Sequence, residues 1–161
     1  MLVYHPAFDN YHCIVRILKI LNNVEVEKYS VDRIKIYDYF LLFPTELRKV
    51  TLPPVWNNFK KIKTENKYNQ VQNSIDVFMR ISGFQDIALN ALSSFGLIDN
   101  QLFSEDFIKK TNKPIKLELK LTPVEQNYFD LVNRYFNNLN LKELKQRTKL
   151  IDYRYELPST K

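Results

Sequence analysis

Glycine is scarce in this sequence of 161 residues, which contains only Gly83 and Gly96. Nucleotide-binding loops with the patterns GxGxxG and GxxxxGK[ST] need two or more closely spaced glycines. Because the two glycines stand thirteen positions apart, neither pattern is present. A turn-dense all-β fold is also disfavoured, since its tight turns depend on glycine.

Cysteine and histidine are nearly absent as well, being limited to Cys13, His5 and His12. One cysteine cannot form an internal disulfide, so a reducing cytoplasm is the expected compartment. A zinc site needs three or four converging ligands, whereas His12 and Cys13 are adjacent and point about 100° apart on a helix. We therefore expect no metal, no cofactor and no catalytic residue, and we expect that the chain is not an enzyme.

Long hydrophobic runs are missing too, because no apolar stretch reaches the roughly 18 residues that a membrane span needs. The N-terminus has no basic region followed by an apolar run, so we expect neither a signal peptide nor membrane contact. Large side chains are abundant instead, with 45% apolar and 14% aromatic residues. Such a chain is able to bury one compact core.

Capping residues and apolar periodicity predict a mainly helical chain. Asp9 and Ser30 precede helical patterns as N-caps, and Thr122 to Glu125 is a capping box with proline at the first helical position. Gly83 is expected to break one helix, and Gly96 to cap the next in the left-handed conformation. The expected helices cover residues 10–22, 31–43, 74–81, 84–95, a segment from 123 and a segment that Asn140 caps. The helix over 84–95 has one apolar stripe of Phe84, Ile87, Ala88, Ala91, Leu92 and Phe95.

A short β element is expected after these central helices. Residues 113–121, KPIKLELKL, alternate apolar and charged side chains with the period of a half-buried strand. A helix that ends in Gly-Leu-Ile before extended residues is similar to the recognition helix and wing of winged-helix folds. We therefore expect an α+β fold, mainly α, with a winged-helix-like arrangement and C-terminal helices. Residues 1–121 are expected to form the core, with a flexible insert near 55–73, and residues 122–161 a helical extension.

Aromatic side chains crowd the first 43 residues. One interpretation is a tyrosine-rich core. The other, which we favour, is an aromatic face that a partner protein covers, since interfaces are enriched in Tyr and Phe. Phe8 stands just before the Asp9 cap and is expected to pack onto the first turn as a hydrophobic staple. The residues assigned to the partner interface are Tyr4, His5, Phe8, Tyr37, Tyr39, Phe40 and Phe43.

The charge balance is basic, with a formal net charge of +6 and a pI of about 9.3. Lysines between residues 60 and 67 are interleaved with aromatic side chains, which suits salt-dependent, sequence-independent phosphate contact. A solvated surface and an acidic protein partner are the alternatives. The residues assigned to nucleic-acid contact are Lys60, Lys61, Lys63 and Lys67.

Two parts of the sequence resemble a known family. The segments YHPAFDNYHCIVRILKIL and YSVDRIKIYDYFLLFP, followed by FQDIALNALSSFGLID, are similar to the middle components of ABC-three-component systems. The resemblance covers about residues 2–46 and 74–99. These small bacterial proteins are encoded between an ABC or SMC-like ATPase and an effector, and Lamassu-type antiphage defence is a related case.

The resemblance implies a non-catalytic adaptor that bridges an SMC-like ATPase and an effector, commonly a nuclease. Such an adaptor is expected to restrain the effector until foreign DNA is sensed. A free-standing winged-helix transcriptional regulator is the alternative. Against that alternative, the helix over 84–95 carries Gln85, Asp86 and Asn90 where a DNA-reading helix usually carries Arg or Lys.

Overall fold

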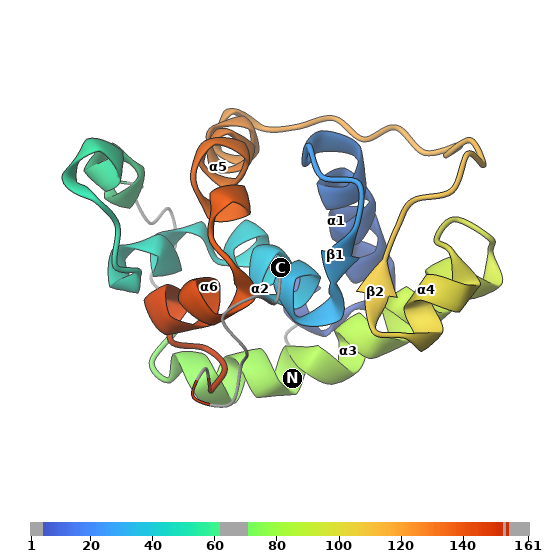
Figure 1. The fold of residues 1–161 in the computed structure, drawn as a ribbon, viewed down its shortest axis with the longest axis horizontal. Coiled ribbons are helices and arrows are strands. Elements are labelled where there is room, and N and C mark those ends of the chain that lie inside the picture. The colour runs from blue at the N-terminus through green and yellow to red at the C-terminus, as the bar shows by residue number, and fades with distance from the viewer. Residues whose placement is uncertain (1–4, 62–70, 153, 155–161) are drawn as a thin grey trace.

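The structure is a computed structural model that describes residues 5–61, 71–152 and 154, and helices dominate in these ranges (Figure 1). The α-helices are α1 (Asn10–Asn23), α2 (Val31–Leu42), α3 (Ser74–Ser94), α4 (Asn100–Ser104), α5 (Pro123–Arg134) and α6 (Leu141–Thr148). The 3-10 helices are η1 (Pro6–Phe8), η2 (Pro44–Lys49), η3 (Pro54–Lys60) and η5 (Phe136–Asn138). The strands are β1 (Tyr29–Ser30) and β2 (Phe107–Ile108). The prediction of a mainly α fold with a small β element is confirmed.

The predicted helix starts agree with the structure because the capping side chains make the expected bonds. Asp9 and Ser30 accept hydrogen bonds from backbone N–H groups of the first turns of α1 and α2. Thr122 and Glu125 form a reciprocal capping box at the start of α5, and Asn140 begins a second such box at α6. Each cap satisfies donors that a helix start otherwise leaves open.

Helix α3 is longer than the sequence indicates, since it runs without a break through Gly83. The prediction that Gly83 separates two helices is therefore wrong. Ile81 and Ala88, which stand before and after the glycine, are both fully buried, so core packing holds the two halves in one helix. Such packing outweighs the cost of about 1 kcal/mol for a helical glycine. Gly96 follows α3 with φ of 73°, as predicted for a left-handed cap.

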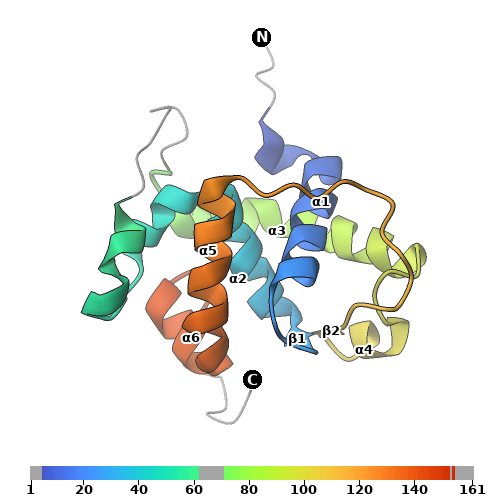
Figure 2. The same ribbon diagram turned by 90° about the horizontal axis from the view of Figure 1, so that it is seen from above.

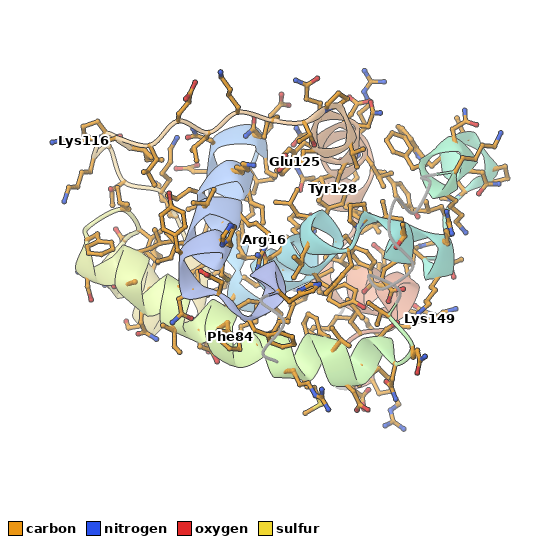
Figure 3. The ribbon with its side chains drawn as sticks, turned by 180° about the vertical axis from the view of Figure 1, so that it is seen from behind. Arg16, Phe84, Lys116, Glu125, Tyr128 and Lys149 are labelled. Carbon is orange, nitrogen blue, oxygen red and sulfur yellow. The ribbon has the colours of Figure 1, made fainter. Side chains whose placement is uncertain are left out.

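Residues 113–121 form an extended segment, here called the strap, which passes α1 on the way from β2 to α5 (Figures 1 and 2). The prediction of a strand here is wrong, because no other described segment pairs with the strap. The two-stranded antiparallel sheet joins β1 to β2 instead, with Tyr29 opposite Ile108. Ile115 and Leu119 of the strap are partly buried against the core, whereas Lys116 points away from the protein (Figure 3). One-sided packing accounts for part of the alternating pattern, because Leu121 is also partly buried against the core whereas Leu117 is 42% exposed.

Helix α2 lies at the centre of the fold. Helices α1 and α3 pack against it and against each other, and α5 and α6 also contact it. The Arg33 guanidinium in α2 donates hydrogen bonds to the carbonyl oxygens of Phe136 at 3.0 Å and Leu139 at 2.6 Å. The Tyr128 hydroxyl in α5 donates to the carbonyl of Tyr37 at 2.8 Å. The C-terminal helices thus share a core with the N-terminal ones, and the predicted domain limit at residue 121 stays a prediction.

The predicted flexible insert near 55–73 begins as ordered structure. Helix η3 covers Pro54–Lys60, and the Trp56 ring lies 6.2 Å from the ring of Tyr135 near the end of α5. Residues 62–70 lie outside the described part of the chain. The flexibility of the insert stays a prediction.

Candidate partner-binding surface

The N-terminal turn holds α1 in a defined position. The backbone N–H of Ala7 donates to Nδ1 of His5 at 3.1 Å, and that of Phe8 donates to the His5 carbonyl at 3.0 Å. Oδ1 of Asp9 then accepts from the backbone N–H of Tyr11 at 2.8 Å. These bonds use the polar atoms of His5 and Asp9 to order the backbone before α1.

Phe8 contacts Phe84 in α3, and the predicted hydrophobic staple of Phe8 onto the first turn of α1 stays a prediction. The ring centroids of Phe8 and Phe84 lie 5.8 Å apart in an edge-on arrangement, and the His5 ring lies 6.1 Å from that of Phe8. Phe8 remains 49% exposed, and Tyr11 is 59% exposed. We call His5, Phe8, Tyr11 and Phe84 the N-terminal aromatic surface; Phe84 is labelled in Figure 3. Tyr4, which the sequence also assigned to the interface, lies outside the described residues.

The other four predicted interface residues are in the core. Tyr37 and Tyr39 are fully buried, Phe40 is 1% exposed and Phe43 is 7% exposed. Tyr37 stacks on Phe136 at 6.2 Å between ring centroids. The assignment of these four side chains to a surface is therefore corrected. The physical reason is that α2 is covered by neighbouring helices around its circumference, as an all-round apolar helix requires.

The predicted nucleic-acid lysines are only partly described. Lys60 ends η3 and is half-buried, and Lys61 follows it and is exposed. The Lys60 carbonyl accepts a hydrogen bond from Nε of Arg48 at 3.3 Å. Lys63 and Lys67 lie outside the described residues. Nucleic-acid contact at these four lysines stays a prediction.

A buried ion pair, which the sequence analysis missed, joins three helices behind the N-terminal aromatic surface. Nε of Arg16 in α1 lies 2.6 Å from Oδ1 of Asp38 in α2. Nε2 of Gln85 in α3 donates to Oδ2 of the same carboxylate at 2.8 Å. Burial alone lowers the pKa of Arg16, but the adjacent Asp38 carboxylate raises it above its ordinary value. The interaction holds α1, α2 and α3 in a fixed relation, and Arg16 is labelled in Figure 3.

The Cys13 thiol lies one turn before Arg16 in α1 and is fully buried. Burial raises the pKa of the Cys13 thiol from 9.0 to about 12, with a smaller contribution from Asp38, so the thiol stays protonated near neutral pH. Within residues 5–61, 71–152 and 154, no three His, Cys, Asp or Glu side chains come together as a metal site. None of the helices in the same ranges is long and apolar enough to cross a membrane.

Comparison with known proteins identifies a family for this chain. A family model described as ABC-three component (ABC-3C) system Middle Component 5 matches residues 2–156. This range includes the three-helix core, the strap and the C-terminal helices, and it confirms the resemblance to middle components. No curated protein and no solved structure matches the chain.

Proposed function

We propose that this chain, which belongs to the ABC-three component (ABC-3C) system Middle Component 5 family, is a non-catalytic adaptor subunit that bridges an ATPase and an effector. The family match over residues 2–156 is the observation that carries the proposal. A middle component of a multi-component system works with partner proteins. The one cysteine of the chain, Cys13, is buried with its pKa raised, which makes it a poor nucleophile. The resemblance of residues 2–46 and 74–99 to middle components supports the adaptor role.

The proposed system is a Lamassu-like antiphage defence complex in the cytoplasm. Its ATPase is SMC-like, and its effector is a nuclease that the adaptor restrains until foreign DNA is sensed. The resemblance of the N-terminal segments to middle components supports this assignment.

The N-terminal aromatic surface is the proposed contact for one partner. Phe8 is half-exposed, and its backbone N–H donates a hydrogen bond to the His5 carbonyl. An aromatic side chain on an ordered turn loses little conformational freedom on binding, which favours affinity. Exposed aromatic anchors are typical of residues that contribute most to binding energy.

A winged-helix-like arrangement is the proposed fold class, and the order of elements supports it. Helix α1, strand β1, and helices α2 and α3 are followed by β2 and by an antiparallel bridge between Ile98 and Lys110. The same order favours the second candidate function, a free-standing DNA-binding regulator. In the adaptor, Lys60 and Lys61 are proposed to contact DNA without sequence preference, and such binding weakens steeply with salt.

Co-expression of the tagged chain with the ATPase and effector encoded beside it tests the proposal. We expect both proteins to co-elute with the chain, with masses that fit one complex. Recovery of the chain alone, together with tight sequence-selective binding of the isolated chain to its own promoter, would favour the regulator. Charge reversal of Lys60 and Lys61 is expected to reduce DNA binding by the complex and to leave assembly intact.

A further inference from the structure

Positive charge is concentrated in two segments that lie beside each other. Residues 44–61, with η2 and η3, and residues 141–149, with α6, together hold eight Lys or Arg and two Glu, a net charge of +6. The whole chain also has a formal net charge of +6, so the charges in the rest of the sequence balance. The backbone N–H of Thr51 donates to the carbonyl of Arg147 at 3.2 Å, and both segments lie on the left of Figure 1. We call residues 44–61 and 141–149 the basic end.

An open hollow of about 540 Å³ lies between the two segments of the basic end. Its described lining residues are Thr51, Glu143, Gln146, Arg147 and Lys149. Thr51, Gln146 and Lys149 are exposed, and Arg147 is half-buried. Guanidinium, ammonium, hydroxyl and amide groups are the side-chain donors that hold the phosphate oxygens of DNA. Four of the five lining side chains therefore suit a phosphate group.

The two carboxylates of the basic end do little to oppose an anion. Glu46 is 5% exposed, and its Oε2 lies 2.9 Å from Nζ of Lys49. Glu143 is exposed, but its Oε2 accepts from the backbone N–H of Asn140 at 3.0 Å in the capping box that begins α6. The cations of the basic end therefore outnumber its exposed carboxylates, as phosphate binding requires.

The lining of the hollow favours duplex DNA over a protein or a single strand. Interfaces between proteins have an apolar core, whereas none of the described lining residues is apolar, and protein–DNA interfaces are more polar and more positively charged. Single strands stack on exposed aromatic rings, but Trp56 of the basic end packs 5.7 Å from Phe59 and 6.2 Å from Tyr135 between ring centroids. A duplex presents its phosphates outward and needs no aromatic platform.

We infer that the basic end binds the phosphate backbone of double-stranded DNA, with Arg147 and Lys149 as the contacts in the hollow. This inference rests on the proposed function, since it extends the proposed DNA contact of Lys60 and Lys61 to α6. Contacts to phosphates carry no sequence information, so the binding is independent of sequence.

Fluorescence anisotropy of a labelled duplex with the purified full-length chain tests the inference. We expect the affinity to fall steeply as salt rises from about 50 to 200 mM. Arg147→Gln combined with Lys149→Gln is expected to weaken binding at least about tenfold and to lower the slope of the logarithm of affinity against that of salt by about 2. Lys116→Gln combined with Lys120→Gln removes the same charge from the strap, at the opposite end of the molecule from Lys149 (Figure 3). This matched control is expected to keep the wild-type affinity.

Thermal unfolding of each variant separates binding from folding, because a cation in the last turn of a helix also stabilises that helix. Lys149→Gln alone, at an exposed position after α6, decides the matter if the double variant loses its fold, and is expected to lower the salt slope by about 1. Wild-type affinity in the folded α6 variants would overturn the inference, even if Lys60→Gln combined with Lys61→Gln weakens binding.

Three further outcomes would also count against duplex DNA at the basic end. Tighter binding of polyglutamate than of the duplex would indicate an acidic protein as the occupant. Tighter binding of a single strand of the same sequence would overturn the assignment to a duplex. Failure of the wild-type chain to bind the duplex would remove the inference together with the Lys60 and Lys61 contact, whereas the adaptor role fails only if the chain does not co-elute with the ATPase and the effector.

Discussion

The two faces of α3 differ in how far the chain itself explains them. On the inner face, Gln85 is fully buried and donates hydrogen bonds to Asp38 at 2.8 Å and to the Lys35 carbonyl at 3.1 Å. On the outer face, Met79 and Ile87 are more than half exposed around Gly83, where an added Cβ atom would meet no described atom within 4 Å. Side chains on the inner face are set by folding, so substitutions there act on stability. Side chains on the outer face are largely exposed, so substitutions there should have little effect on stability.

The largest effect is predicted for Asp38→Ala in α2, whose carboxylate accepts a hydrogen bond from Gln85 on the inner face of α3. This change leaves the Arg16 guanidinium buried without its carboxylate, and the loss of one partner of a buried ion pair typically costs 3–5 kcal/mol. We expect urea unfolding to show a loss of about 3–5 kcal/mol in the free energy of unfolding. Asp86→Ala removes a carboxylate from an exposed ion pair and is the control, with an expected loss of at most about 1 kcal/mol. Similar losses for the two variants would contradict the comparison.

The next largest loss of stability is expected for Tyr39→Phe in α2, close to the first residue of α3. The Tyr39 hydroxyl donates to Oε1 of Glu46 at 2.6 Å, and that oxygen also accepts from the Ser74 hydroxyl of α3 at 2.5 Å. Tyr39→Phe removes one donor from a buried carboxylate, so unfolding measurements are expected to show a loss of about 1–3 kcal/mol. Tyr11→Phe, at an exposed tyrosine, should change stability by less than about 0.5 kcal/mol. A silent Tyr39→Phe would show that this bond adds nothing to stability.

A smaller effect is predicted from alkaline pH at Cys13. Burial raises the pKa of the thiol in the folded chain to about 12, from 9.0. The unfolded chain therefore loses this proton first as pH rises, so stability is full below about pH 9 and declines towards pH 12. Between pH 8 and pH 10 we expect the wild type to lose about 1 kcal/mol more than Cys13→Ala. Equal pH dependence in both chains would contradict the assigned burial of the thiol.

The smallest effect on stability is expected on the outer face. Met79→Glu places a carboxylate at a position that is 69% exposed, so the free energy of unfolding should change by less than about 0.5 kcal/mol. Val55→Glu, at a position that is 74% exposed, is the control and is expected to change the free energy of unfolding as little. A loss of stability in Met79→Glu but not in Val55→Glu would show that Met79 contributes to folding in spite of its exposure.

Local signals in the sequence predicted the helix starts well. Asp9 and Thr122 act through hydrogen bonds within a few residues, so their role is visible in a short window. Gly83 and the strap were misread because their structures depend on distant contacts. Packing on the core carries α3 through the glycine, and no other segment in the described part of the chain pairs with the alternating sequence of the strap.

The candidate surface was only partly predictable for the same reason. Phe8 and Phe84 are 76 positions apart in the sequence but their rings are in contact. A pattern within a short stretch of sequence cannot predict such a long-range contact. The apolar stripe predicted for residues 84–95 placed Ile87 with buried residues, although it is 53% exposed. Arg16 carried a usable signal, because a charged residue three positions after Cys13 falls on the apolar side of α1 and needs a buried partner.

Whether the chain bridges two partners is the central claim, and native mass spectrometry of pairwise mixtures tests it most directly. The purified ATPase, the purified effector and this chain would be mixed in pairs and then together. We expect the chain to form a complex with each partner, and the ATPase and the effector to associate only when the chain is present. A stable ATPase–effector complex that forms without the chain and leaves it unbound would contradict the account.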